Sequence, residues 1–255
     1  MRNVTRFVTV LLLAMACAAC VAPGTKAPPA PPATPNFVFN PPDQAKQKLD
    51  KAVAIVGPKT SGTMWGGNVF DAYMYEDGER NRSRGALAEM LKASRVDLEK
   101  TMIARGFNTV GPFVNIDEMT FTQKERAFVL FEPVFDTNLE FVAARPVAGL
   151  FGVQKTEGNV TTRGSVTLAF YEPLSREKVW LKRVELTPIS EPYLMTRQVV
   201  DGKVLSYSSN QSDAVVRSLN KFYTEAMGKI WSQIDPREIS ALQKDVDQLK
   251  AKKRF

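Results

Sequence analysis

The chain has 255 residues, a formal net charge of +7, no histidine and only two cysteines, Cys17 and Cys20. Without histidine it lacks the commonest general base and the commonest metal ligand, so we expect no metal site, no cofactor and no catalytic residue of the usual kinds. Paired carboxylates or a Ser–Lys pair could still support an enzyme, but no such set stands out. Binding and structural roles are therefore favoured over catalysis.

The first twenty residues have the pattern of an export signal. Arg2 and Arg6 precede an apolar run over residues 7–16, which is well short of the roughly 20 residues that a membrane-spanning helix requires. Two alanines then precede Cys20, whose thiol can accept diacylglycerol. The pattern predicts a lipoprotein signal peptide over residues 1–19, with Cys20 as the lipidated first residue of the mature chain.

Two alternatives to this interpretation stay open. Cys17 is a competing acylation site with a poorer small-residue pattern before it, and an ordinary signal peptide with incidental cysteines is the second alternative. Acyl chains such as palmitate on Cys20 would hold the protein on a bilayer, because each buried methylene contributes about 0.8 kcal/mol. Val21 is not the aspartate that marks inner-membrane retention in many lipoproteins. We therefore expect a lipid-anchored protein of the cell outer membrane.

The remainder of the chain divides into two parts. Residues 20–42 comprise the lipidated cysteine and a stretch rich in proline and alanine. This composition favours extended polyproline II and cannot form a core, so we expect a tether. Residues 43–255 are long enough to bury one core, and we expect them to form a single α+β domain.

Strand and helix signals alternate in the first part of this domain. The apolar run Ala52–Val56 predicts a buried strand. A helix is predicted over residues 83–105, with a serine at its start and Gly106 at its end. Residues 107–113 read as a second strand, and residues 116–126 form an ambiguous segment compatible with a short helix.

From residue 127 the apolar period changes to two. This alternation predicts antiparallel strands up to residue 186 and a further strand over residues 193–200. The turn signals between them are Glu132-Pro133, Gly158-Asn159, Glu172-Pro173 and Asp201-Gly202.

The C-terminal third returns to the helical period. Asn210 is predicted to cap a long helix, with Asp213 in its first turn, where the helix dipole favours an acid. Asp235-Pro236 predicts the start of a second helix, whose apolar seam packs on the same body or on a partner; we favour the same body. The predicted fold class is α+β: a mainly antiparallel or mixed sheet with packed helices and a long C-terminal helix pair. The stripe of the first helix is Val215, Leu219, Phe222, Ala226 and Ile230, and the seam of the second is Ile239, Leu242, Val246 and Leu249.

No motif in the domain supports a chemical assignment. Gly57-Pro58-Lys59-Thr60 lacks the first glycine of a phosphate loop and carries a proline where an amide donor is needed. Trp65 could stack on a sugar, but a tryptophan that anchors a loop in the core is the simpler role. The acidic residues Glu76, Asp77 and Glu79 read as a solvated turn. Asp136 and Glu140 fall on different predicted segments and give no evidence for an acid–base pair.

The basic tail, Lys250 with Lys252, Lys253 and Arg254, has two interpretations. Cations are favourable at a helix C-terminus because of the macrodipole, and they could also attract an anionic lipid or a nucleic acid. We favour the helix end and expect no nucleic-acid partner, because the chain carries an export signal.

The domain resembles the neuraminyllactose-binding hemagglutinin family of outer-membrane lipoproteins, also described as flagellar sheath adhesins. The resemblance is clearest in the two C-terminal helices and extends over nearly all of the mature domain. The residues that carry it are Ser212-Asp213-Ala214-Val215, Leu219-Asn220-Lys221, Met227, Leu242-Gln243-Lys244-Asp245, Leu249-Lys250, the turn Glu172-Pro173-Leu174-Ser175 and the helix exit Arg105-Gly106-Phe107.

The resemblance implies a non-enzymatic surface or sheath lipoprotein of adhesin type, with a glycan or an envelope protein as the possible partner. In that family, sialic-acid binding was assigned to a short basic segment between the central strands. The corresponding residues 144–152 contain one basic residue, Arg145, so no binding residue carries over to this chain. The alternative function is a periplasm-facing lipoprotein that scaffolds or regulates envelope machinery.

Overall fold

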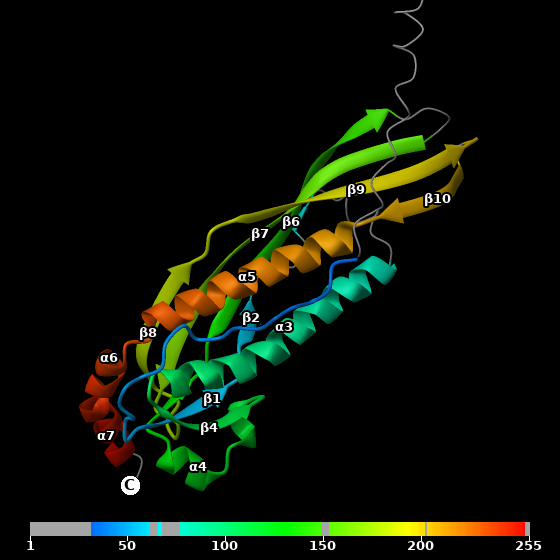
Figure 1. Ribbon diagram of the computed structural model, residues 1–255. Coiled ribbons are helices and arrows are strands. Elements are labelled where there is room, and N and C mark those ends of the chain that lie inside the picture. The colour runs from blue at the N-terminus through cyan, green and yellow to red at the C-terminus, as the bar shows by residue number, and fades with distance from the viewer. Residues whose placement is uncertain (1–31, 62–65, 68–76, 149–152, 202, 253–255) are drawn as a thin grey trace, which may run out of the picture. The chain divides into compact units, whose positions relative to one another are not determined.

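The computed structural model describes residues 32–61, 66–67, 77–148, 153–201 and 203–252. Residues Ala33–Phe255 belong to one compact unit, in which two long helices cover one face of a ten-stranded mixed sheet (Figure 1). This arrangement confirms the predicted α+β class. Among the described helices, none has the length and the apolar composition needed to span a bilayer.

The sheet combines a small parallel part with a large antiparallel part. Strand β1 pairs in parallel with β4 and β5, and β2 and β3 pair in parallel with β6. The pairs among β5 to β10 are antiparallel, as the alternation predicts. The main path runs β10 (Lys203–Ser209), β9 (Ile189–Val200), β7 (Val153–Tyr171), β5 (Val129–Phe131), β1 (Ala52–Val56) and β4 (Asn108–Phe113); β2 (Lys59–Ser61), β3 (Gly66–Gly67), β6 (Val134–Ala148) and β8 (Lys178–Glu185) lie off it.

The predicted turn at Gly158-Asn159 is wrong, because β7 runs through both residues without interruption. Gly158 pairs with Tyr193 of β9, and a Cβ atom at Gly158 would lie 2.6 Å from the phenol ring of Tyr193. The glycine therefore makes room for an aromatic ring within the sheet and does not reverse the chain.

Helix α3 (Asp77–Ala104) begins six residues before the predicted start at Ser83, which is buried inside the helix. The early turns have little apolar periodicity, but Arg82 fastens them to Asp213 at 2.6 Å. Gly106 adopts a φ of 92° after the last turn and ends the helix as predicted. The ambiguous segment after β4 forms the 3-10 turn η1 (Ile116–Glu118) and the short helix α4 (Phe121–Arg126).

The C-terminal helices are α5 (Gln211–Gln233), α6 (Pro236–Ala241) and α7 (Gln243–Lys252). Asn210 occupies the cap position of α5, but its side chain accepts a hydrogen bond from the Leu194 amide of β9 at 2.7 Å instead of capping the helix. Asp235 caps α6 as predicted, through the Arg237 amide at 2.8 Å. Within the seam, Ile239 and Val246 are buried in the main core, which confirms packing on the same body.

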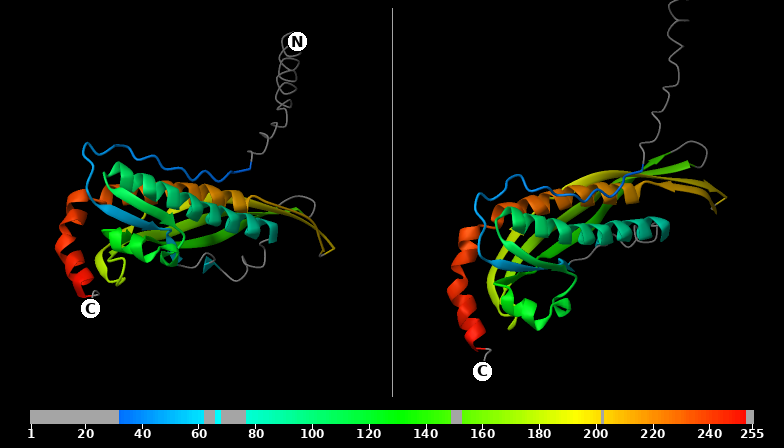
Figure 2. Two further views of the ribbon diagram at one scale, coloured as in Figure 1. Left: turned by 90° about the horizontal axis from the view of Figure 1, so that it is seen from below. Right: turned by 60° about the horizontal axis from the view of Figure 1, so that its bottom comes forward.

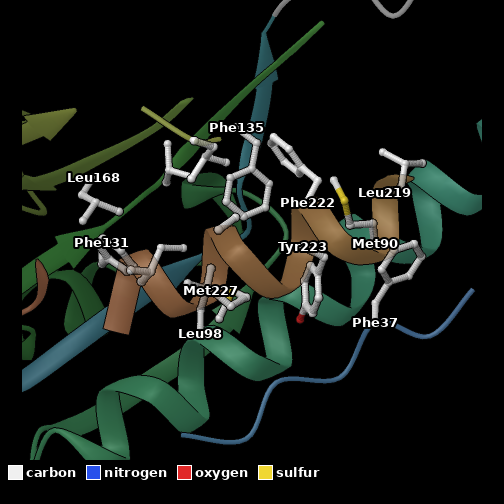
Figure 3. Packing of buried hydrophobic residues seen from close by; sticks show 14 of the residues in the cluster. Phe37, Met90, Leu98, Phe131, Phe135, Leu168, Leu219, Phe222, Tyr223 and Met227 are labelled. Atoms are coloured by element: carbon white, nitrogen blue, oxygen red, sulfur yellow. The ribbon is translucent and has the colours of Figure 1, made fainter. Parts of the chain in front are cut away.

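The main core lies between the sheet and helices α3 and α5 (Figure 3). The predicted stripe of α5 is buried, with every member at most 1% exposed. On β1, Val53 and Ile55 enter this core, whereas Ala54 and Val56 point to a second, smaller core beneath η1 and α4. Both faces of β1 are therefore covered, as its uninterrupted apolar run requires.

The chain before β1 forms an extended segment, residues 33–50, that lies along α3 and α5 in both views of Figure 2. We call it the strap. Phe37 is only 8% exposed, and its ring meets that of Tyr223 edge to face at 5.5 Å between centroids. Residues 33–42, which the sequence assigns to the tether, thus belong to the compact unit. An inserted aromatic ring supplies the apolar burial that the proline-rich composition lacks.

Replacement of Gly164 in β7 by alanine should destabilise the domain. A Cβ atom there would overlap the carbonyl oxygen of Asp136 and lie 3.1 Å from Phe222, so we expect urea denaturation to show a free energy of unfolding lower by about 1–3 kcal/mol. Gly228→Ala on α5 is the matched control, because its Cβ meets nothing within 4 Å. That change should raise stability by up to about 1 kcal/mol; equal effects of the two changes would contradict this packing.

Candidate functional site

The face of the sheet opposite α3 and α5 is the candidate binding surface over β6 to β9. On β7, Thr162 hydrogen-bonds Ser218 of α5, and a Cβ at Gly164 would contact Phe222 of α5. Because side chains alternate along a strand, Arg163 and Ser165 point to the opposite face. We call this face the open face.

Strand pairing fixes which side chains share the open face. Paired residues of antiparallel strands point to the same side. Four central rows of this face are mostly polar, and the rows on either side of them carry the exposed apolar residues Val142 and Leu181. The rows across the sheet are Glu140–Thr161–Ser190, Asn138–Arg163, Asp136–Ser165–Glu185 and Val134–Thr167–Arg183.

Charged side chains on the open face are paired within strands and across them. Arg183 reaches Asp136 at 3.4 Å and Glu185 at 2.9 Å, and Arg163 lies 3.7 Å from Glu140. Asp136 and Glu140 therefore lie on one strand, β6, and not on the two segments that the sequence suggests. Each carboxylate faces a guanidinium group, so the two do not form an acid–base pair.

The exposure of these pairs determines what the surface can do. The side chains of Arg163 and Arg183 are 59% and 58% exposed, and pairs of this kind contribute little to stability because water screens them. They can exchange partners with a ligand at low cost. The exposed guanidinium and carboxylate groups of this face suit a polar ligand that forms several hydrogen bonds, whereas Ser165 and Thr161 of the same face are buried.

A second charged cluster, between β9 and α5, is built around a buried carboxylate and is structural. Glu191 is 7% exposed and accepts from Lys221 at 2.6 Å and from Arg217 at 2.9 Å. Burial acts to raise the pKa of Glu191, but the hydrogen bonds and charges of Lys221 and Arg217 outweigh it and hold the pKa below its ordinary value of 4.5. The cluster fixes β9 against the helix.

Asp97 of α3 is the third charged centre, and the sequence analysis does not single it out. Its side chain is 4% exposed and pairs with Lys100 at 2.8 Å. The other carboxylate oxygen accepts from the Tyr223 hydroxyl and from the Phe39 amide, each at 2.6 Å. Burial, then the hydrogen bond to Asp97 and its charge, raise the pKa of Tyr223. This cluster joins α3, α5 and the strap.

The other residues discussed in the sequence have simpler roles or lie outside the described residues. Lys59 lies on β2 and pairs with Glu132 at 2.8 Å, consistent with the rejection of a phosphate loop. Asp77 and Glu79 lie on α3, and residues 144–148 continue β6. Outside the described residues are Cys17, Cys20, Trp65, Glu76, residues 149–152 and the tail from Lys253.

Lys250, the first residue of the basic tail, contacts a helix end. Lys250, in the last turn of α7, donates to the carbonyl oxygens of Glu125 and Ala127 at 2.9 and 2.8 Å. These carbonyl groups lie at the C-terminus of α4, so the cation closes a neighbouring helix.

In the part of the chain that the structure describes, no group of three or more acidic or cysteine side chains is arranged to hold a metal ion.

The lowered pKa of Glu191 predicts a specific pH dependence. A carboxylate with a lowered folded pKa stabilises the protein fully above its unfolded pKa, and this contribution is lost as the pH falls through the folded pKa. We expect Glu191→Gln to lower the urea midpoint at about pH 7 and to reduce the further loss of stability below about pH 4. Glu185→Gln, at a side chain 72% exposed, is the control; an acid profile unchanged in Glu191→Gln would contradict the assignment.

Similar proteins are known, although no family model matches the chain. The neuraminyllactose-binding hemagglutinin of Helicobacter pylori strain ATCC 700392 / 26695 is 20% identical over 231 residues, which is 84% of this chain and 83% of that protein. Its counterpart in Helicobacter pylori strain J99 / ATCC 700824 has the same identity and coverage.

A solved structure supports the same relation at the level of the fold. The crystal structure of a neuraminyllactose-binding hemagglutinin homologue from Helicobacter pylori aligns with a TM-score of 0.53 and 14% identity, covering 84% of this chain and 98% of that chain. The chain is a distant homologue of the neuraminyllactose-binding hemagglutinins.

Proposed function

We propose that the protein is a non-enzymatic lipoprotein of adhesin type, held in the outer membrane by acyl chains on Cys20. The observation that carries this proposal is the distant homology to hemagglutinins over 84% of the chain. The signal pattern before Cys20 supports the anchor independently.

We infer that the open face contacts the partner, a glycan or another polar component of a cell surface. Its exposed guanidinium and carboxylate groups can form charge-assisted hydrogen bonds, which are the stronger kind. The segment 144–152 contributes only Arg145 as a basic residue, so a lysine- and arginine-rich binding segment is not part of this proposal.

Replacement of each cysteine separately tests the anchor. Cys20→Ser should abolish incorporation of labelled palmitate and move the protein from the membrane fraction to the soluble fraction, because no acyl chain remains to insert into the bilayer. Cys17→Ser is the matched control and should keep both label and membrane association. Label retained in Cys20→Ser but lost in Cys17→Ser would move the lipid to Cys17, and label absent from the parent would refute the anchor.

Agglutination of red cells tests the binding role. Cells displaying the parent should agglutinate them, and Arg163→Ala should raise the required cell density by about tenfold, since a lost charge-assisted hydrogen bond costs about 1.5–3 kcal/mol. Arg84→Ala, at an exposed residue of α3, is the control. Protease shaving of intact cells distinguishes the alternative: a fully protected domain would favour a periplasm-facing scaffold and contradict the adhesin.

A further inference from the structure

The strap fills a groove between α3 and α5 with a chain segment that these helices bind from both sides. Phe37 is the only residue of 33–39 that is fully buried, and Figure 3 shows its ring between the two helices beside Met90 and Tyr223. It inserts into the main core as a single aromatic anchor. The other residues of this segment are exposed or half-buried.

The hydrogen bonds to residues 33–39 come from helix side chains and go to the strap backbone. Asn220 is the clearest case, because its amide accepts from the Asn36 N–H and donates to the Thr34 carbonyl, as a neighbouring strand would. The contacts are Ala33 N to Asp213 Oδ1 at 3.0 Å, Arg82 to Ala33 O at 2.6 Å, Asn36 N to Asn220 Oδ1 at 2.9 Å, Asn220 Nδ2 to Thr34 O at 3.1 Å, and Phe39 N to Asp97 Oδ2 at 2.6 Å.

This pattern is that of a peptide-binding groove. Contacts to backbone atoms recognise an extended chain whatever its side chains are, and one buried anchor sets the register. The prolines at positions 32 and 35 restrict the segment toward the extended form and lower the entropy lost on docking. The groove therefore fits an extended, proline-containing segment with one aromatic anchor.

A short connection joins this segment to the later part of the strap, which has its own contacts with the domain. The next backbone contacts of the strap are Ala45 N to Ala104 O and Leu49 N to Gly106 O, each at 2.7 Å. Between Phe39 and Ala45 the chain contains Pro41 and Pro42 and is mostly exposed. Residues 40–44 can thus act as a hinge, and exchange of an identical element between copies is a low-cost route to a dimer.

We propose that the α3–α5 groove is a binding site for an extended peptide, and that residues 33–39 of a second copy occupy it in a strap-exchanged dimer. Within one chain the strap competes at an effective concentration on the order of millimolar. Exchange therefore requires crowding, which confinement to a membrane surface provides. The same contacts form in the monomer and in the dimer, and the exchange introduces no new strain. Its cost is the independent motion that the two copies lose.

A labelled peptide with the sequence of residues 32–42 tests the groove. The protein is the full chain with Cys17→Ser and Cys20→Ser, so that no lipid is attached. With Phe37→Ala added, its own strap is weakened, and fluorescence anisotropy should show saturable binding of the peptide. Asn220→Ala in that chain should weaken binding by about tenfold, because two hydrogen bonds to the peptide are lost. Lys229→Ala, an exposed residue of the same helix, should leave binding unchanged.

Because Phe37→Ala removes a core side chain and could impair folding, Asn36→Pro is a second way to weaken the strap. It removes the N–H that donates to Asn220 Oδ1 and keeps Phe37 in the core. Absence of saturable binding to the variant that circular dichroism shows to be folded overturns the peptide site. Binding that Asn220→Ala does not change overturns it as well.

Light scattering of the chain that keeps its own strap tests the second copy. Concentration should produce a dimer that excess peptide dissociates, whereas the Asn36→Pro chain should remain monomeric under the same conditions. A strictly monomeric chain at all concentrations, with peptide binding intact, overturns the second copy as occupant. A dimer that excess peptide leaves intact overturns it too.

Discussion

The carboxylate of Asp97 is the interaction on which the arrangement of the helical layer depends. It lies in the interior, where an unpaired charge is very costly, and it is satisfied by three groups from three parts of the chain. Lys100 neutralises it within α3, Tyr223 brings α5 to a fixed distance, and the Phe39 amide brings in the strap. Loss of any one partner leaves the others with a poorly satisfied buried charge, so the three segments hold their positions together.

The two faces of the sheet beneath this layer differ in polarity. Toward α3 and α5 it is apolar, with Phe135, Leu139 and Leu168 in the main core. Toward the other side, a second core that includes Ile116 of η1 lies against β1, and exposed paired charges lie over β6 to β8. This division follows from the alternation of side chains along antiparallel strands, and it leaves the exposed arginines of the open face, Arg163 and Arg183, accessible to water.

Much of this architecture could be predicted where one physical signal dominates. The stripe of α5 follows the helical period without exception, and the Asp235 cap combines an acid with a proline in the first turn. The turn predicted at Gly158 is wrong because the sequence does not distinguish a glycine that forms a turn from one that makes room for an aromatic ring. The docking of the strap was missed because its prolines match an unfolded spacer, and only the tertiary fold shows where Phe37 inserts. In the sequence, Asp97 looks like any acidic residue of a charged helix. Arg163 and Arg183 likewise look like solvated strand residues, and only the strand register shows that they lie on one face.

If Cys20 carries the proposed lipid, the docked strap also shortens the chain that links this lipid to the body of the protein. Twelve residues, 21–32, would then separate Cys20 from the first docked residue, and any chain of twelve residues reaches at most about 40 Å. A spacer that ended at residue 42 would reach nearly twice that distance. The volume that the body can search scales with the cube of this radius, so docking of residues 33–42 reduces it to roughly one sixth. If the proposed lipid anchor holds, partners would accordingly have to come within that shorter distance of the bilayer.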